Sequence, residues 1–201
     1  MSAHAQPRLT PEQYLEIERA AERKSEYYNG RMYAMAGASA AHVLVTANLT
    51  GEVRSALKGR PCLVFHSDLR VRVPPAVLYA YPDLAVVCGK PAYAEPGRDT
   101  LLNPTAIIEV LSPSTEAYDR GLKFALYRKI ESLQEYVLVS QTDARIEVFR
   151  RKPGEKWELS EFTGLDAVCQ FESLDCSVAL SEVYQNVPFE EGPSIHPSAE
   201  V

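Results

Sequence analysis

Two short apolar runs, Leu84–Cys88 and Ala106–Leu111, constrain the fold more than any other feature of the sequence. Neither run alternates between apolar and polar residues, so both faces of each strand have to be covered. Interior strands of this kind are typical of a sheet with helices on both sides. The sequence therefore predicts an α/β fold with a central mixed β-sheet flanked by helices.

The flanking segments supply an N-terminal helix and a β-hairpin. Thr10 and Gln13 have the spacing of a capping box and Pro11 suits the first helical position, which predicts a helix to about Lys24. Asn29-Gly30 predicts a two-residue hairpin turn within residues 25–35. The other expected elements are helices at 39–58, 119–131 and 180–184, and strands at 62–73, 135–140, 145–150 and 157–162.

Chain length and composition predict one domain. A chain of 201 residues can bury a substantial core, and we place the domain at residues 9–187. Residues 1–8 and 188–201 offer little to bury, so we expect both ends to be disordered.

Charge, hydropathy and cysteine spacing narrow the class of protein. The formal net charge of −6 argues against a global positive field, so any DNA contact has to be local. We expect a cytoplasmic protein without membrane contact, because the sequence lacks an apolar stretch of roughly 18 to 20 residues and a signal peptide. The cysteines have no CxxC spacing, so we expect buried thiols and no disulfide or zinc cluster. They are Cys62, Cys88, Cys169 and Cys176.

Glu109 places an ionisable carboxylate inside the run Ala106–Leu111. A buried carboxylate has to be paired, bound to a metal or kept neutral. Asp83 stands at the entry of the other run, after Pro82, so the two carboxylates converge if the strands are neighbours. Two carboxylates with waters and a backbone carbonyl suit Mg²⁺ or Mn²⁺. The alternatives are an arginine-paired structural acid for Glu109 and a turn or cap residue for Asp83.

Lys123 falls on the apolar side of the helix expected over 119–131. At about 100° per residue, the positions on this side span roughly one hundred degrees of arc. They are Asp119, Leu122, Lys123, Leu126 and Ile130. The Lys123 ammonium can therefore meet the acids of the sheet, and the alternative is a lysine that extends to solvent along the apolar surface. Asp119 either orients this ammonium or helps to start the helix.

Several patterns in the chain match those of a known class of nucleases. They are Glu26-Tyr-Tyr-Asn-Gly30, Tyr81-Pro-Asp-Leu84, Ile108-Glu-Val-Leu-Ser-Pro-Ser-Thr115 and the Asp119, Lys123, Tyr127 spacing. The Pro82-Asp83 and Glu109 pair resembles the first two elements of the PD-(D/E)xK, or restriction-endonuclease-like, superfamily. The full combination, from about Leu9 to Val187, resembles the bacterial Uma-type restriction endonuclease family. The resemblance implies a restriction-endonuclease-like fold and magnesium-dependent cleavage of DNA.

The chain departs from the superfamily at one position. A lysine usually follows the acid by two positions, where this chain has Leu111. The Uma-type family carries the lysine on the following helix, which implies this role for Lys123. The resemblance also implies Glu26 as an auxiliary acid, although an exposed strand residue is an equal alternative, and the Val110 carbonyl as a metal ligand. It implies a homodimer as well, because cutting two strands often uses two sites.

Substrate contacts are expected around this site. His42 lies near the start of a helix, where a structural role is the alternative to a substrate contact. The candidate phosphate contacts are Arg70, Arg72, Arg120 and Arg128. Asp68 is a reserve carboxylate. Ser112 and Ser114 suit turn and cap positions, because no base stands beside them.

These residues predict an endonuclease in which Asp83 and Glu109 hold the metal and Lys123 orients the attacking water or stabilises developing charge. A rival hypothesis keeps the fold as a catalytically inactive DNA-binding or accessory protein. A third is a metal hydrolase acting on another phosphate-containing substrate. Metal titration separates the first two, and a substrate panel distinguishes the third.

Overall fold

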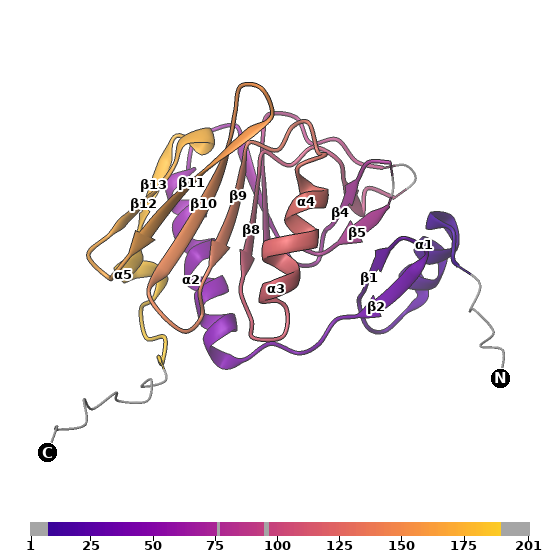
Figure 1. Cartoon of the computed structure of the whole chain (residues 1–201), viewed down its shortest axis with the longest axis horizontal. Helices are drawn as coiled ribbons and strands as arrows, with labels where there is room; N and C mark the ends of the chain where they lie inside the picture. Colours follow the sequence, from indigo (N-terminus) through magenta and orange to yellow (C-terminus); the bar gives the residue numbers. More distant parts are fainter. Residues whose placement is uncertain (1–7, 76, 95–96, 190–201) are drawn as a thin grey trace, which may run out of the picture.

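The computed structural model describes residues 8–75, 77–94 and 97–189, and its middle layer is a six-stranded mixed sheet (Figure 1). The strand order is β11-β10-β9-β8-β6-β3. The strands are β3 (Cys62–His66), β6 (Leu84–Cys88), β8 (Ala106–Val110), β9 (Glu135–Val139), β10 (Arg145–Lys152) and β11 (Lys156–Thr163). The two apolar runs are the neighbours β6 and β8, which pair antiparallel, and β8 runs parallel to β9. The predicted α/β class with a mixed sheet is confirmed.

A five-stranded sheet with the order β2-β1-β5-β4-β7 contains the predicted hairpin. Its strands are β1 (Ser25–Tyr28), β2 (Arg31–Ala34), β4 (Arg70–Val73), β5 (Leu78–Ala80) and β7 (Thr100–Leu101). Asn29 and Gly30 form the hairpin turn with φ angles of 45° and 87°, as the Asn-Gly pair predicts. A third sheet pairs β12 (Val168–Phe171) with β13 (Cys176–Ala179).

Helices cover the six-stranded sheet on both faces (Figure 1). The covering helices are α2 (Ala40–Ala56) on one face and α3 (Glu116–Tyr118), the π-helical turn η1 (Asp119–Lys123) and α4 (Phe124–Tyr127) on the other (Figure 1). Helix α1 (Pro11–Ala20) packs against β1 instead, and the 3₁₀ turn η2 (Glu172–Leu174) and α5 (Leu180–Val183) belong to the C-terminal part. The Thr10 capping box is present at the start of α1. Within the described residues, no helix combines the length and apolar character that crossing a membrane requires.

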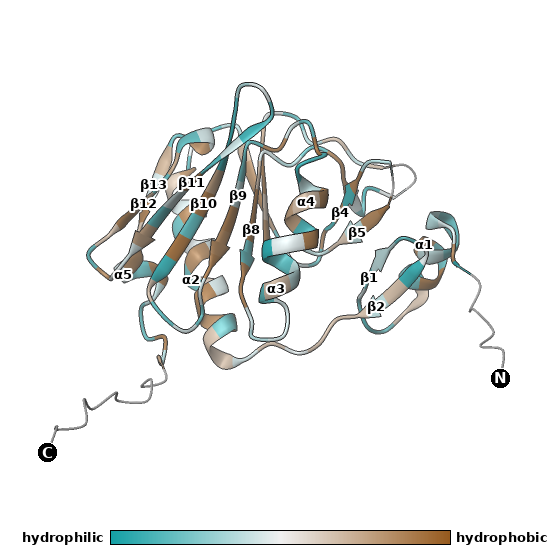
Figure 2. Ribbon diagram, in the orientation of Figure 1, coloured by the Kyte–Doolittle hydropathy of each residue, from teal (hydrophilic) through white to brown (hydrophobic). Residues whose placement is uncertain are grey.

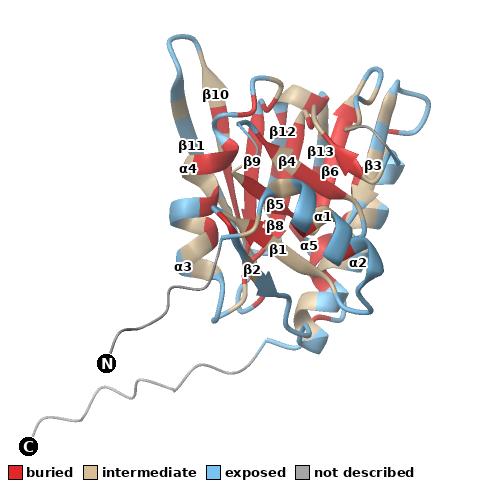
Figure 3. Cartoon of the chain, turned by 90° about the vertical axis from the view of Figure 1, so that its right-hand side faces the viewer, coloured by how far each residue is buried: buried red, intermediate tan, exposed pale blue. Residues whose placement is uncertain are grey.

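Alternation along the central strands divides the core into two parts. Leu84 and Ile108 belong to the cluster under α2, whereas Ala85 and Ile107 belong to the cluster under α4 and the five-stranded sheet. Figure 2 shows β8 and β9 as largely hydrophobic, and Figure 3 shows buried residues along the central strands. Because neighbours along a strand point to opposite faces, Glu109 projects toward the α4 side.

Several element boundaries differ from the predictions. The strand expected over 62–73 is two strands in different sheets, because the chain turns between His66 and Leu69. The helix expected over 119–131 begins at Glu116, contains a π turn and ends at Tyr127. Strands β5, β7, β12 and β13 were not predicted, because they are short and pair only through tertiary contacts. The ends expected to be disordered fall outside the described residues, except for Arg8 and residues 188–189.

The cysteines differ from the prediction. Cys62 and Cys88 form a disulfide, so the expectation of four free thiols is wrong for this pair. They stand opposite each other in the antiparallel pairing of β3 and β6, with Cα atoms 4.0 Å apart. This proximity depends on strand register, which the spacing of cysteines does not show. Cys169 is a buried free thiol, as predicted, and Cys176 is a free thiol that is partly exposed.

Candidate active site

Asp83 and Glu109 meet at the ends of two neighbouring strands. The pairing of Leu84 with Ile108 continues by one position, which places Asp83 opposite Glu109 and on the same face of the sheet. Asp83 Oδ2 accepts a hydrogen bond of 2.7 Å from the Val110 amide, which fixes this carboxylate against the end of β8. The structure therefore brings together the two acids that the sequence places 26 positions apart.

Lys123 reaches this pair from the covering helix. Its Nζ lies 2.9 Å from Glu109 Oε1, 3.3 Å from Asp119 Oδ1 and 3.3 Å from Glu26 Oε1. The lysine is only 5% exposed and Glu109 is 4% exposed, so both charges are removed from bulk water. We name the set Glu26, Asp83, Glu109, Asp119 and Lys123 the acid–lysine cluster. Its members come from β1, the entry of β6, β8 and η1.

Local structure explains how η1 contributes two members. Asp119 and Lys123 are the first and last residues of the π-helical turn, and both are buried. Wide turns of this type often occur at functional sites. The sequence indicates the inward direction of Lys123 from α-helical spacing, but it does not indicate the π turn.

Two buried tyrosines support the acid–lysine cluster. The Tyr127 hydroxyl donates a hydrogen bond of 3.1 Å to Glu109 Oε1, and the Tyr136 hydroxyl donates one of 3.0 Å to the Asp119 carbonyl. Neither tyrosine was predicted as a site residue. Tyr127 had a detectable signal, since it follows Lys123 by four positions on the same helical side. Tyr136 lies on β9, whose register with the helix is a tertiary property.

The acid–lysine cluster holds more acid than base, with four carboxyl groups around one ammonium. Burial raises the pKa of Glu109 well above its usual value, and the charges of Asp119 and Asp83 add to this rise while Lys123 opposes it. Burial likewise raises the pKa of Asp119. Burial would lower the pKa of Lys123, but the carboxylates around it, led by Glu109, raise its pKa well above the usual value. The lysine therefore keeps its proton, and its single positive charge cannot balance all four carboxyl groups.

His42 lies at the outer side of this cluster, near the start of α2. Its Nε2 is 3.4 Å from Asp83 Oδ2, and its imidazole also interacts with the Val110 backbone. Burial alone would lower the pKa of His42, but the hydrogen bond and charge of Asp83 raise it above the usual value. His42 therefore contacts two of the three residues that the sequence analysis proposed as metal ligands, Asp83 and Val110.

The donors present fit a hard divalent cation. The Asp83 and Glu109 carboxylates and the Val110 carbonyl are oxygen donors, and a dication would offset the surplus of negative charge. Among the described residues, no three His, Cys, Asp or Glu side chains form a metal-binding group by themselves. A cation held here would take its remaining ligands from water or substrate, as Mg²⁺ commonly does.

Other predicted site residues lie outside the acid–lysine cluster. Arg70 is buried, because its side chain is enclosed by contacts with Asp99, Thr100 and Tyr81. Arg72 interacts with Tyr79, and the Arg128 guanidinium lies 5.1 Å from the centre of the Phe124 ring. The reserve carboxylate Asp68 is exposed and pairs with Lys24 at 2.9 Å.

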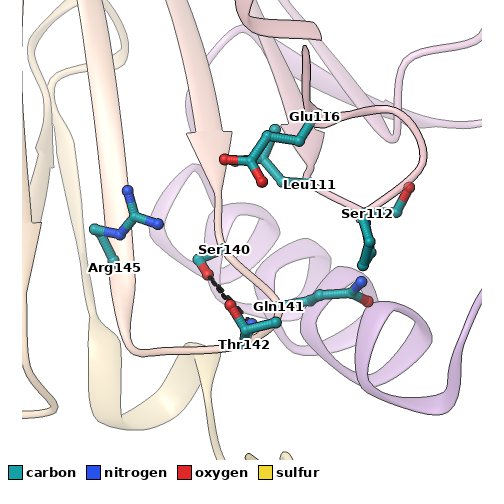
Figure 4. A pocket seen from close by; sticks show the side chains of 8 residues that line it. Leu111, Ser112, Glu116, Ser140, Gln141, Thr142 and Arg145 are labelled. Atoms are coloured by element: carbon teal, nitrogen blue, oxygen red, sulfur yellow. Dashed lines mark hydrogen bonds between the residues drawn. The ribbon is translucent and has the colours of Figure 1, made fainter. Parts of the chain in front are cut away.

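A small polar pocket lies at the carboxyl ends of β8 and β9 (Figure 4), and Arg120 pairs with Glu116 of its lining. The Arg120 guanidinium pairs with Glu116 at 2.7 Å and with Glu147 at 2.6 Å. The residues that line this pocket are Leu111, Ser112, Pro113, Glu116, Ser140, Gln141, Thr142 and Arg145. The Ser112 hydroxyl interacts with those of Ser114 and Thr115, in keeping with a turn role. Arg120 thus lies beside the acid–lysine cluster rather than within it.

The mixed sheet and the helices that cover it define a restriction-endonuclease-like, nuclease-type fold. Residues 11–181 match the family model described as "Uma2: Putative restriction endonuclease", so the chain belongs to this family. The resemblance found in the sequence is confirmed.

Similar proteins cover most of the chain. Two proteins of Synechocystis sp., both named as uncharacterized, are similar to this chain. The protein slr1290 is 34% identical over 91% of this chain and 95% of its own length. The protein sll1609 is 36% identical over 81% of this chain and 92% of its own length. A crystal structure from Anabaena variabilis, described as "a putative nuclease belonging to DUF820", matches with a TM-score of 0.71 and 20% identity. The match covers 88% of this chain and 97% of the Anabaena variabilis chain, and this likeness shows the fold.

Proposed function

We propose that this protein is a magnesium- or manganese-dependent endonuclease that hydrolyses phosphodiester bonds of DNA. The observation that carries the proposal is the buried contact of 2.9 Å between Lys123 and Glu109, with Asp83 opposite Glu109 on the neighbouring strand. Membership of a family described as restriction endonucleases supports the choice of DNA as substrate.

In this proposal Asp83, Glu109 and the Val110 carbonyl hold the cation. When bound, such a cation polarises a phosphate and lowers the pKa of a coordinated water. Glu26 is an auxiliary acid, since its carboxylate contacts Lys123 from the hairpin side. His42, half-buried at the edge of Asp83, is a substrate contact in this proposal.

Lys123 acts as a charged donor rather than as a base. Its neighbouring carboxylates raise its pKa, so the ammonium stays protonated at neutral pH. A protonated ammonium can orient an attacking water or stabilise the negative charge that develops on a phosphate oxygen. Three carboxylates hold its position before substrate arrives, which lowers the cost of reorganisation during the reaction.

Of the four arginines predicted to contact phosphate, Arg120 is the one that lies near the acid–lysine cluster. It is partly exposed and stands one helical turn from Glu116, beside the polar pocket. We include it as a phosphate contact and leave out the buried Arg70. The homodimer and the cytoplasmic location stay predictions, and sedimentation of the purified chain tests the former.

The test is cleavage of supercoiled plasmid DNA in Mg²⁺ or Mn²⁺, with EDTA as the blank. We expect Lys123→Met and Lys123→Ala to lose at least about 100-fold in rate while cation binding survives. Lys129→Ala is the matched control, because Lys129 is an exposed lysine in the same region. Full activity in folded Lys123→Met would remove Lys123 from the site. Wild-type protein that neither binds Mn²⁺ nor cuts DNA would favour an inactive DNA-binding protein.

A further inference from the structure

One face of the β1–β2 hairpin carries both a member of the acid–lysine cluster and an exposed aromatic and basic surface. In the antiparallel register, Glu26 stands opposite Tyr33 and Tyr28 stands opposite Arg31. Opposed residues share a face, and so do residues two apart on one strand. The face that brings Glu26 to within 3.3 Å of Lys123 therefore also carries these three side chains.

The far end of this face forms a surface pocket. The pocket is lined by Arg8, Tyr28, Asn29, Arg31 and Tyr33, and we name it the hairpin pocket. Tyr33 is 49% exposed, whereas Tyr28 packs partly against the core. Figure 3 shows that β2 is largely exposed. The pocket therefore joins one fixed and one accessible aromatic ring to two guanidinium groups.

Arg8 is held in place at this pocket by the hairpin turn. The Leu9 amide donates a hydrogen bond of 2.9 Å to the Gly30 carbonyl, which anchors the segment before α1 on the turn. Gly30 has a φ angle of +87°, and a Cβ at this position would lie 2.6 Å from Arg8 Cβ. The turn thus needs glycine for its backbone angle and for the close approach of Arg8.

The two arginines of the hairpin pocket differ from six other arginines of this acidic protein in having no carboxylate partner among the described residues. Within the described residues, neither Arg8 nor Arg31 forms an ion pair. The arginines that do pair with acids are Arg19, Arg60, Arg70, Arg120, Arg145 and Arg150. Unpaired guanidinium groups in a chain of net charge −6 form a local site for an anion.

We propose that the hairpin pocket binds unpaired nucleotides of a DNA strand next to the scissile phosphate. This inference rests on the proposed function for its position beside a phosphate that is cut. Arg8 and Arg31 contact backbone phosphates, and a base stacks on Tyr33, since arginines with exposed aromatic rings bind single strands in this way. A paired base in a duplex hides its faces, so the exposed ring favours a single-stranded segment.

The distance along the hairpin fits this arrangement. Residues in a strand advance by about 3.3 Å each, so Tyr28 lies roughly 7 Å along β1 from Glu26. A strand of DNA whose phosphate reaches Lys123 therefore passes the hairpin pocket with its neighbouring nucleotides. The substrate class that follows is DNA with unpaired nucleotides at the cleavage position, such as a single strand, flap or frayed end.

The test is binding of a fluorescein-labelled 12-nucleotide single strand of mixed sequence and of its duplex to the full chain in EDTA, followed by anisotropy. We expect the single strand to bind more tightly than the duplex. Arg31→Ala should reduce the slope of log affinity against log salt by about 0.7. Tyr33→Ala should weaken single-strand binding by about tenfold, and Tyr33→Phe should restore it.

Arg54→Ala is the matched control, because Arg54 is exposed on α2 and has no ion pair among the described residues. It should leave the affinity and the salt slope unchanged. Unchanged binding in both folded hairpin variants, equal weakening of duplex and single strand by Tyr33→Ala, or tighter binding of the duplex would overturn the inference. Because the measurement needs no cleavage, an inactive wild-type protein that still shows these differences counts against the proposed chemistry alone.

Discussion

Two buried acid–base pairs lie at opposite ends and on opposite faces of the six-stranded sheet. Glu135 at the start of β9 pairs with Arg150 at 3.0 Å, and Glu109 near the end of β8 pairs with Lys123 at 2.9 Å. Glu135 also accepts hydrogen bonds from the Glu172 amide and the Ser173 hydroxyl. The other donors of Arg150 reach the Ser160 hydroxyl and the Gln170 carbonyl.

The difference between the pairs lies in their stoichiometry. Around Arg150 the buried acid and base are equal in number, and the nearby Glu172 carboxylate is exposed. At Lys123, one ammonium pairs with three carboxyl groups, those of Glu26, Glu109 and Asp119, and Asp83 lies close to Glu109. We call the Glu135–Arg150 pair saturated, because its one buried acid and one buried base neutralise each other and no further ligand is required. A buried surplus of acid lowers stability, and in the proposed function a bound cation would balance it.

Removing the acid of the saturated pair should have the largest effect on stability. Glu135→Ala leaves the buried Arg150 guanidinium without its counter-charge and removes the acceptor for Ser173. We expect a loss of about 3 to 5 kcal/mol in the free energy of unfolding, measured by urea denaturation. A loss below about 1 kcal/mol would show that this pair does little for the fold.

The equivalent neutral substitution in the acid–lysine cluster should have the opposite sign. Glu109→Gln keeps an acceptor for the Tyr127 hydroxyl and reduces the surplus of acid. Metal-free protein should gain about 1 kcal/mol in the free energy of unfolding while DNA cleavage is lost. Glu135→Gln is the matched control and should lower stability. If Glu109→Gln lowers stability as much as Glu135→Gln, both pairs act as structural ion pairs and the proposed difference between them is wrong.

The pH dependence of stability sharpens the same comparison. Glu109 has a raised pKa in the folded state, so between its unfolded value near 4.5 and its folded value the native state binds more protons than the unfolded state. Its contribution to stability therefore falls as pH rises through this window. Wild type and Glu109→Gln should be equally stable near pH 4, and the variant should gain on wild type above about pH 4.5. Parallel curves for the two metal-free proteins would contradict the raised pKa.

The fold could be predicted where short-range pattern decides it. The apolar runs at Leu84–Cys88 and Ala106–Leu111 gave the central strands, and helical spacing gave the inward direction of Lys123. Register-dependent features could not be predicted, such as the Cys62–Cys88 disulfide. The burial of Arg70, a predicted phosphate contact, could not be predicted either, because it depends on contacts with Tyr81, Asp99 and Thr100, which are distant in the sequence.

The central claim is that the surplus acids of the acid–lysine cluster form a cation site, and calorimetric titration of metal-free protein with Mn²⁺ tests it most directly. The account predicts binding to wild type and to Lys123→Met, and loss of at least about tenfold in affinity in Asp83→Asn and Glu109→Gln, because each removes one of two carboxylate ligands. Wild-type protein that binds no Mn²⁺, or binding that both carboxylate variants retain in full, would contradict it.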